Sequence, residues 1–98
     1  MTDQVRRYQR LLHEQLPYLR KRYNVASLGL FGSYLHGTQR RESDLDVLVT
    51  FAEAPSLLRL IELENYLSDK LGVKVDLVPR SALKPNIGRR VLQEVVPV

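Results

Sequence analysis

The sequence predicts an α/β protein of mixed α+β type, in which helices pack on a small mixed β-sheet in the order α-β-α-β-α-β-α. Three short apolar segments, 25–31, 44–51 and 73–78, have the length and composition of strands. Two longer segments, the N-terminal one up to Tyr23 and 56–71, repeat apolar residues every three or four positions, as amphipathic helices do. Asparagine, glycine or proline separates most of these segments, which favours distinct elements.

The N-terminal segment predicts a long amphipathic helix. Thr2 or Asp3 can cap its start, and Asn24 is suited to end it. Pro17 falls inside the segment, so we expect either a kink or a break after which Pro17 begins a second short helix. The stripe that should face the core consists of Val5, Tyr8, Leu12, Leu16, Leu19 and Tyr23.

Segment 25–31 is almost wholly apolar, which predicts a strand buried on both faces. Gly32 ends it, and residues 33–36 can form one helical turn closed by Gly37. A polar loop then leads to the second strand at 44–51. Because this connection is only about a dozen residues long, it favours antiparallel pairing of the first two strands.

Segment 56–71 is predicted to be a helix that ends at Gly72. Its expected inner face consists of Leu57, Leu60, Leu63, Leu67 and Leu71. The third strand, 73–78, follows and ends at Pro79. A full helix between the second and third strands predicts a parallel crossover.

A last helix is expected from Pro85 or Asn86 to Val95, with Gly88 weakening its first turn. The residues expected on its inner face are Ile87, Val91, Leu92 and Val95. The apolar tail at 95–98 could cover the core or meet another subunit.

The chain has 98 residues, and we expect a single domain over 1–98. The absence of cysteine excludes disulfides and thiolate metal sites. No apolar leader is visible, and no apolar run reaches the ~20 residues that a membrane span needs. We therefore expect a cytoplasmic protein without membrane contact.

The net charge of +4 is unevenly distributed: residues 1–41 carry +6 and residues 42–98 carry −2. A basic N-terminal half can attract a polyanion such as a triphosphate, an RNA or an acidic partner. A solvated helix face is the simpler explanation of the charges on Arg6, Arg7, Arg10, Arg20, Lys21 and Arg22. The charge alone therefore does not identify a ligand.

The strongest functional signal combines a turn and three aspartates. Gly32 and Ser33 follow an apolar strand, and a glycine-led turn into a helix is a suitable place for phosphate. Asp44 and Asp46 begin the second strand on one face, because side chains alternate along a strand. Asp76 in the third strand can add another carboxylate. Carboxylate oxygens suit a hard cation, so the set predicts Mg²⁺-dependent chemistry on a nucleoside triphosphate.

Each of these signals has a simpler explanation when taken alone. A Gly-Ser pair is usually an ordinary strand-to-helix turn, and Asp44 by itself could be a loop or capping residue. Asp46 and Asp76 are harder to explain in this way, because carboxylates inside apolar strands are unusual. The prediction of a metal site therefore depends on the spacing of the Gly-Ser pair and the three aspartates taken together.

This combination resembles the nucleotidyltransferase superfamily that includes DNA polymerase β. Ten residues separate Ser33 from Asp44, and the stretch FGSYLHGTQRRESDLDVLVTF is similar to that of minimal nucleotidyltransferases. Members often read Gly-Ser-x-Ala-Arg-Gly, whereas here Leu35 stands at the small residue and His36 at the arginine. A fixed guanidinium fork is thereby replaced by an imidazole ring. Arg40 and Arg41 are the expected substitutes in nucleotide binding.

The resemblance implies a polymerase β-like nucleotidyltransferase fold and transfer of AMP from ATP to a hydroxyl. It implies two Mg²⁺ ions, with Asp44 and Asp46 as shared ligands. Asp76 would hold the catalytic ion and accept the proton of the incoming hydroxyl. Gly32 and Ser33 would contact the phosphates.

The resemblance also implies a partner. Minimal nucleotidyltransferases are commonly paired with HEPN-domain toxins, which they inactivate as antitoxins by adenylylating a tyrosine. Two alternatives stay open: a binding module that blocks its partner by contact with little catalysis, and an enzyme that modifies a small molecule such as an aminoglycoside. A homodimer or a hetero-oligomer is compatible with each.

Overall fold

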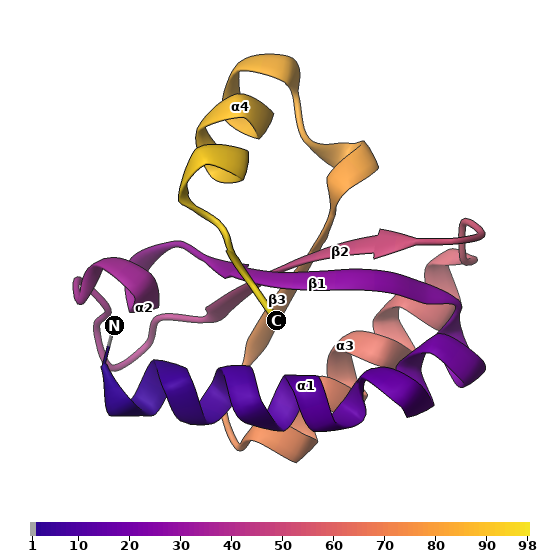
Figure 1. The fold of residues 1–98 in the computed structure, drawn as a ribbon, viewed down its shortest axis with the longest axis horizontal. Helices are drawn as coiled ribbons and strands as arrows, with labels where there is room; N and C mark the ends of the chain where they lie inside the picture. Colours follow the sequence, from indigo (N-terminus) through magenta and orange to yellow (C-terminus); the bar gives the residue numbers. More distant parts are fainter. Residues whose placement is uncertain (1) are drawn as a thin grey trace.

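The computed structural model describes residues 2–98 and confirms the mixed α/β fold (Figure 1). The elements, in chain order, are α1 (Asp3–Tyr23), β1 (Val25–Phe31), α2 (Ser33–His36), β2 (Leu45–Phe51), α3 (Leu57–Leu71), β3 (Val75–Pro79), the 3-10 turn η1 (Arg80–Ala82), α4 (Pro85–Glu94) and β4 (Val96–Pro97). The predicted order is therefore right, apart from η1 and β4.

The four strands form one sheet in the order β3-β2-β1-β4. β1 and β2 are antiparallel, with Phe31 opposite Asp46, and β2 and β3 are parallel, with Asp46 opposite Asp76. Both predicted pairings are confirmed. β4, which was not predicted, adds two residues antiparallel to β1 at the far edge. This short strand has no periodicity of its own, so only the neighbouring β1 edge defines it.

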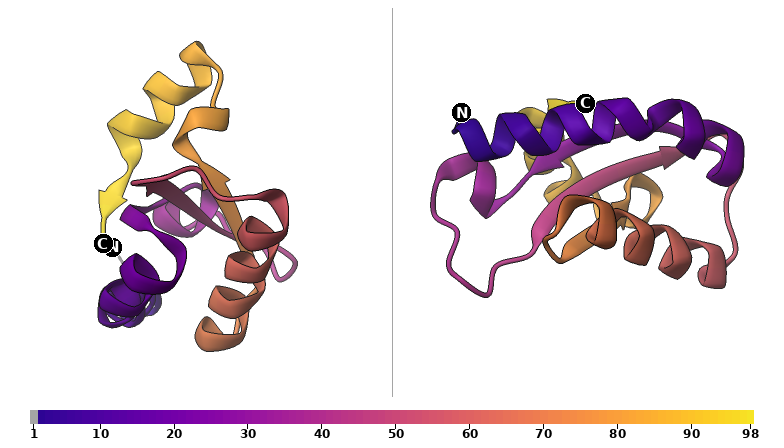
Figure 2. Two further views of the ribbon diagram at one scale, coloured as in Figure 1. Left: turned by 90° about the vertical axis from the view of Figure 1, so that its right-hand side faces the viewer. Right: turned by 90° about the horizontal axis from the view of Figure 1, so that it is seen from below.

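The helices lie on opposite faces of the sheet (Figures 1 and 2). α1 and α3 cover one face side by side, whereas α4 stands over the other face. The main core lies between the sheet and the α1/α3 pair. All six residues of the predicted α1 stripe are buried there, together with Leu28, Leu30, Leu45, Val47, Val49, Leu63, Leu67, Val75 and Leu77.

The break considered at Pro17 is wrong, because α1 runs without interruption from Asp3 to Tyr23. Pro17 is exposed, on the side of α1 away from the core. The carbonyl that loses its helical partner belongs to His13, which is also exposed, so water can satisfy it. Burial of the stripe then stabilises the helix across the proline.

Three residues predicted to face the core are exposed instead. Leu57 is 71% exposed because α3 begins at this residue, immediately after its Ser56 cap. Ile87 is 54% and Leu92 is 42% exposed. Gly88 and Val91 are the buried residues of α4, and Gly88 lies beside Leu83, so the sides of the helix that carry Ile87 and Leu92 stay open.

Two strands begin later than expected. β2 starts at Leu45, so Asp44 lies just before it, and β3 starts at Val75, two residues after the predicted position. Gly72 has a φ of 69° at the end of α3, and the chain turns through Val73 and Lys74 before it pairs with β2.

Side chains of α3 cover the outer edge of β3. The Leu77 N–H donates to Glu64 Oε2 at 2.9 Å, and the Val75 N–H donates to Ser68 Oγ at 2.9 Å. Uncovered strand edges invite pairing with other chains, and these side chains occupy the donors instead. The edge that carries Asp76 is thus closed to strand addition at these two positions.

We predict that Glu64→Ala lowers the free energy of unfolding by about 1–2 kcal/mol, because the half-buried Leu77 N–H loses its acceptor. Denaturant unfolding followed by circular dichroism measures this loss. Asp69→Ala, at an exposed position of the same helix, is the control and should change stability by less than about 0.5 kcal/mol. Equal losses in the two variants would show that the bond to Leu77 contributes nothing.

Candidate active site

Asp46 and Asp76 project from the sheet face over which α4 lies. Along β2, Val47 and Val49 enter the main core, so Asp46 points to the opposite face. Asp76 is the parallel-strand neighbour of Asp46 in register, and its side chain lies on the same face. Two strands therefore place two carboxylates side by side, one half-buried and one exposed.

Burial is the largest cause that raises the pKa of Asp46 from 3.8 to about 6. The negative charges of Asp76 and Asp44 raise it further, and so does a hydrogen bond with Asp76, which favours the protonated carboxyl. The site therefore holds more negative charge than the fold alone stabilises. A bound cation would relieve that repulsion.

Asp44 lies beside this pair without completing it. It precedes β2, is partly exposed, and has its Oδ2 3.9 Å from Lys74 Nζ. Its charge nevertheless reaches Asp46, as the raised pKa of Asp46 indicates. The structure thus brings all three predicted carboxylates to one end of β2 and β3, with Asp46 between the other two.

Gly32 shapes the other wall of the site. Its φ of 84° and ψ of −157° belong to a region that is essentially restricted to glycine. A Cβ at this position would overlap the Asp46 carboxylate, so the turn and the carboxylate are in direct contact. Ser33 follows as the first residue of α2, directly after Gly32, and it is half-buried.

The predicted nucleotide-binding arginines are not gathered at the carboxylates. Arg40 and Arg41 are exposed on the loop between α2 and β2. The backbone N–H of Arg40 donates to Ser43 Oγ at 2.8 Å, which shapes this loop. Among residues 2–98, neither guanidinium forms an ion pair with an acidic side chain.

His36, at the position of the usual motif arginine, contacts α4. Its Nε2 lies 3.2 Å from Glu94 Oε2, and this exposed pair links the end of α2 to the last residue of α4. The sequence carried no signal for this contact, because 58 positions separate the two residues. α4 is thereby placed alongside the carboxylates.

The donor set fits Mg²⁺ if the substrate contributes ligands. Within residues 2–98, no three His, Cys, Asp or Glu side chains form a ready metal-binding group. Mg²⁺ usually takes one or two carboxylates and completes its shell with water and substrate phosphates. Asp46 and Asp76 meet that requirement, and after burial the neighbouring carboxylates are the main causes that raise the pKa of Asp46.

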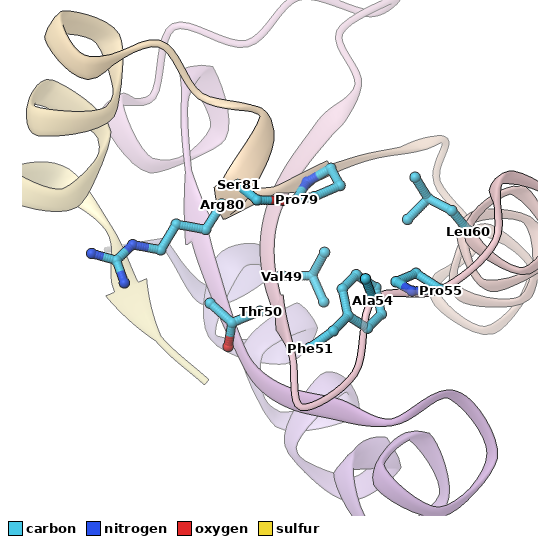
Figure 3. Close-up of a pocket in the computed structure, with 9 residues that line it drawn as sticks. All are labelled: Val49, Thr50, Phe51, Ala54, Pro55, Leu60, Pro79, Arg80 and Ser81. Carbon is cyan, nitrogen blue, oxygen red and sulfur yellow. The ribbon is translucent and has the colours of Figure 1, made fainter.

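Two hollows of the surface lie away from the carboxylates. One of about 580 Å³ opens at the far end of β2, and Figure 3 shows its lining, which includes Phe51, Pro55, Leu60 and Arg80. Phe51 is five positions after Asp46, which corresponds to about 16 Å of strand. A second hollow of about 340 Å³ lies between Thr50, Leu92 and their neighbours. Neither hollow is lined by a carboxylate, so neither is the candidate active site.

The sequence profile described as "Nucleotidyltransferase domain" matches residues 12–98. The chain belongs to this nucleotidyltransferase family. A protein adenylyltransferase MntA of Thermococcus cleftensis is 54% identical over 78 residues, which cover 80% of this chain and 79% of the relative. The chain is therefore an enzyme of the nucleotidyltransferase class, related to protein adenylyltransferases.

Solved structures agree with this family membership. A minimal nucleotidyltransferase structure has a TM-score of 0.78 at 35% identity and covers 99% of this chain and 97% of its own. A toxin–antitoxin structure with AMP-PNP has a TM-score of 0.71 at 29% identity and covers 87% of this chain and 69% of its own. The nucleotidyltransferase thus shares its fold with minimal members of the family. None of its helices, within residues 2–98, has the length and apolar content to cross a membrane.

Proposed function

We propose that this nucleotidyltransferase transfers AMP from ATP to a hydroxyl of a partner protein, with Mg²⁺ held by Asp46, Asp76 and Asp44. The observation that carries the proposal is the in-register pair Asp46 and Asp76 beside Gly32. The similarity to a protein adenylyltransferase and to a structure with AMP-PNP supports the choice of substrates.

In the reaction, the acceptor oxygen bonds to the α-phosphorus, the bond to the β-phosphate oxygen breaks, and pyrophosphate leaves. Bound Mg²⁺ would stabilise the charge that develops on the phosphates and the leaving group. Asp76, the more exposed of the central pair, can accept the proton of the acceptor hydroxyl. Gly32 leaves room for the phosphates to approach, and Ser33, Arg40 and Arg41 are the proposed phosphate contacts.

The proposed partner is a HEPN-domain toxin, with this enzyme as its antitoxin. Two features support a protein acceptor. Asp76 is exposed, and its strand β3 lies at the edge of the sheet, where a partner's side chain can reach it. The enzyme would then work in the cytoplasm as a hetero-oligomer with its toxin.

The alternative proposal is an antitoxin that acts by contact with little catalysis. One observation favours it: His36 replaces the usual arginine and is engaged with Glu94. The two proposals differ in what the carboxylates do. In the enzyme they are essential, and in the contact antitoxin they are dispensable.

We expect Asp46→Asn and Asp76→Asn to lower transfer of label from α-³²P-ATP to the partner by roughly 100-fold or more, because each removes a charge that the metal site needs. Asp69→Asn, an exposed carboxylate on α3, is the matched control and should retain full activity. Tight partner binding without any transfer, unchanged in all variants, would instead support the contact antitoxin.

A further inference from the structure

α4 lies over the same sheet face as the candidate site, and its contacts fix how it is rotated. Val91 is buried, and Leu92 lines the hollow that also includes Leu48 and Thr50 of β2. Glu94 reaches His36 at the end of α2. The flank that carries Glu94 therefore faces α2, which begins directly after Gly32, and Leu92 lies on a different side of α4.

Arg90 lies on the flank that faces α2. Residues four apart on a helix are neighbours on one face, so Arg90 is one turn before Glu94 on the same side. Relative to Leu92 it is turned by about 160°, and relative to Glu94 by only about 40°. Arg90 is exposed, and among residues 2–98 no carboxylate lies within ion-pair distance of it.

Arg89, the preceding residue, lies on a different side of α4. It is equally exposed, but it projects to the outer side of α4, where its Nη2 donates to Asn86 Oδ1 at 3.4 Å. The two arginines thus share residue type, helix and exposure, and they differ in the side of α4 that they occupy. This makes Arg89 a matched control for Arg90.

We propose that Arg90 binds the triphosphate of the nucleotide and takes the place of the arginine that His36 replaces. This inference rests on the proposed function, since it assumes a nucleoside triphosphate at the carboxylates. A guanidinium presents several N–H donors in a planar fork that matches phosphate oxygens. Its long side chain extends from the flank of α4 that also carries Glu94, and Glu94 contacts His36 at the end of α2.

The test compares three proteins by calorimetry: the wild type, Arg90→Met and Arg89→Met, each titrated with ATP and with AMP in Mg²⁺. We expect Arg90→Met to weaken ATP binding about tenfold or more, because a charge-assisted phosphate contact is lost. Arg89→Met should stay within about twofold of the wild type. AMP, which lacks the β- and γ-phosphates, should be affected much less by Arg90→Met than ATP.

Each result is decisive. Equal ATP affinity in the two variants, with a wild type that binds ATP, would overturn the role of Arg90 and leave the proposed function intact. A wild type that binds no ATP in Mg²⁺ would overturn both. Thermal melts identify any variant that fails to fold, and both methionine variants should melt close to the wild type because both arginines are exposed.

Discussion

Replacing Gly32 with alanine is expected to abolish nucleotidyl transfer and to destabilise the protein by about 3 kcal/mol or more. Two effects add. The backbone angles of Gly32 are strained for any other residue, at about 1–3 kcal/mol. The new Cβ would also overlap the Asp46 carboxylate, so Asp46 or the whole turn must move. Either movement separates the phosphate turn from the carboxylates.

The matched control is Gly72→Ala. Gly72 also has a positive φ, 69°, but a Cβ there would meet nothing within 4 Å. The free energy of unfolding of the Gly72→Ala variant should fall by about 1 kcal/mol through backbone strain alone, and the variant should keep its activity. Urea unfolding gives the stabilities, and transfer of labelled AMP gives the activities. A Gly32→Ala protein as active as Gly72→Ala would show that contact between the turn and Asp46 is unimportant for catalysis.

Asp46→Asn is expected to separate stability from activity. In the folded, metal-free protein the pKa of Asp46 is about 6, above its ordinary value of 3.8. A raised carboxyl pKa means that folding disfavours the charged form, so stability is lost as the pH rises from about 4 through 6. The shift corresponds to roughly 1–3 kcal/mol at pH 7. Asparagine removes this cost at pH 7 and has a much smaller effect near pH 4, where the folded carboxyl is protonated and the unfolded one is only partly ionised.

The measurement is the free energy of unfolding of both proteins, in a chelator, between pH 4 and pH 8. Asp46→Asn should be the more stable protein at pH 7, and the difference should shrink toward pH 4. Addition of Mg²⁺ with ATP should then stabilise the wild type and not the variant, because a ligand stabilises only the form that binds it. A constant difference across the pH range would contradict the proposed repulsion.

These variants test different parts of one arrangement. The Gly32 variant tests the contact between the turn and the Asp46 carboxylate. The Asp46 variant tests the negative charge of the site. The Arg90 variant tests whether a side chain of α4 contacts the triphosphate. Loss of activity in the first two with an unaffected Arg90→Met would place the triphosphate contact elsewhere, on Arg40 or Arg41. Those two residues are on a loop that could move toward the site, and they remain predictions from the sequence.

Local patterns made much of this fold predictable. The α1 stripe was right at all six positions, because a helix that covers a sheet repeats its apolar residues at its own period. The positions of Asp46 and Asp76 on neighbouring strands followed from strand alternation and a parallel crossover. The residues of the α1 stripe are only a few positions apart in the chain. Asp46 and Asp76 are farther apart, but a general topological rule places their strands.

The sequence by itself determined the elements, the pairing of the three long strands and the carboxylate-bearing residues. Only the tertiary structure decided that Ile87 and Leu92 are exposed, that β4 joins β1, and that His36 meets Glu94. These features depend on how a terminal helix docks on a sheet face, through contacts between residues far apart in the chain. No local periodicity encodes that docking, and it alone places Arg90 on the side of α4 that faces α2.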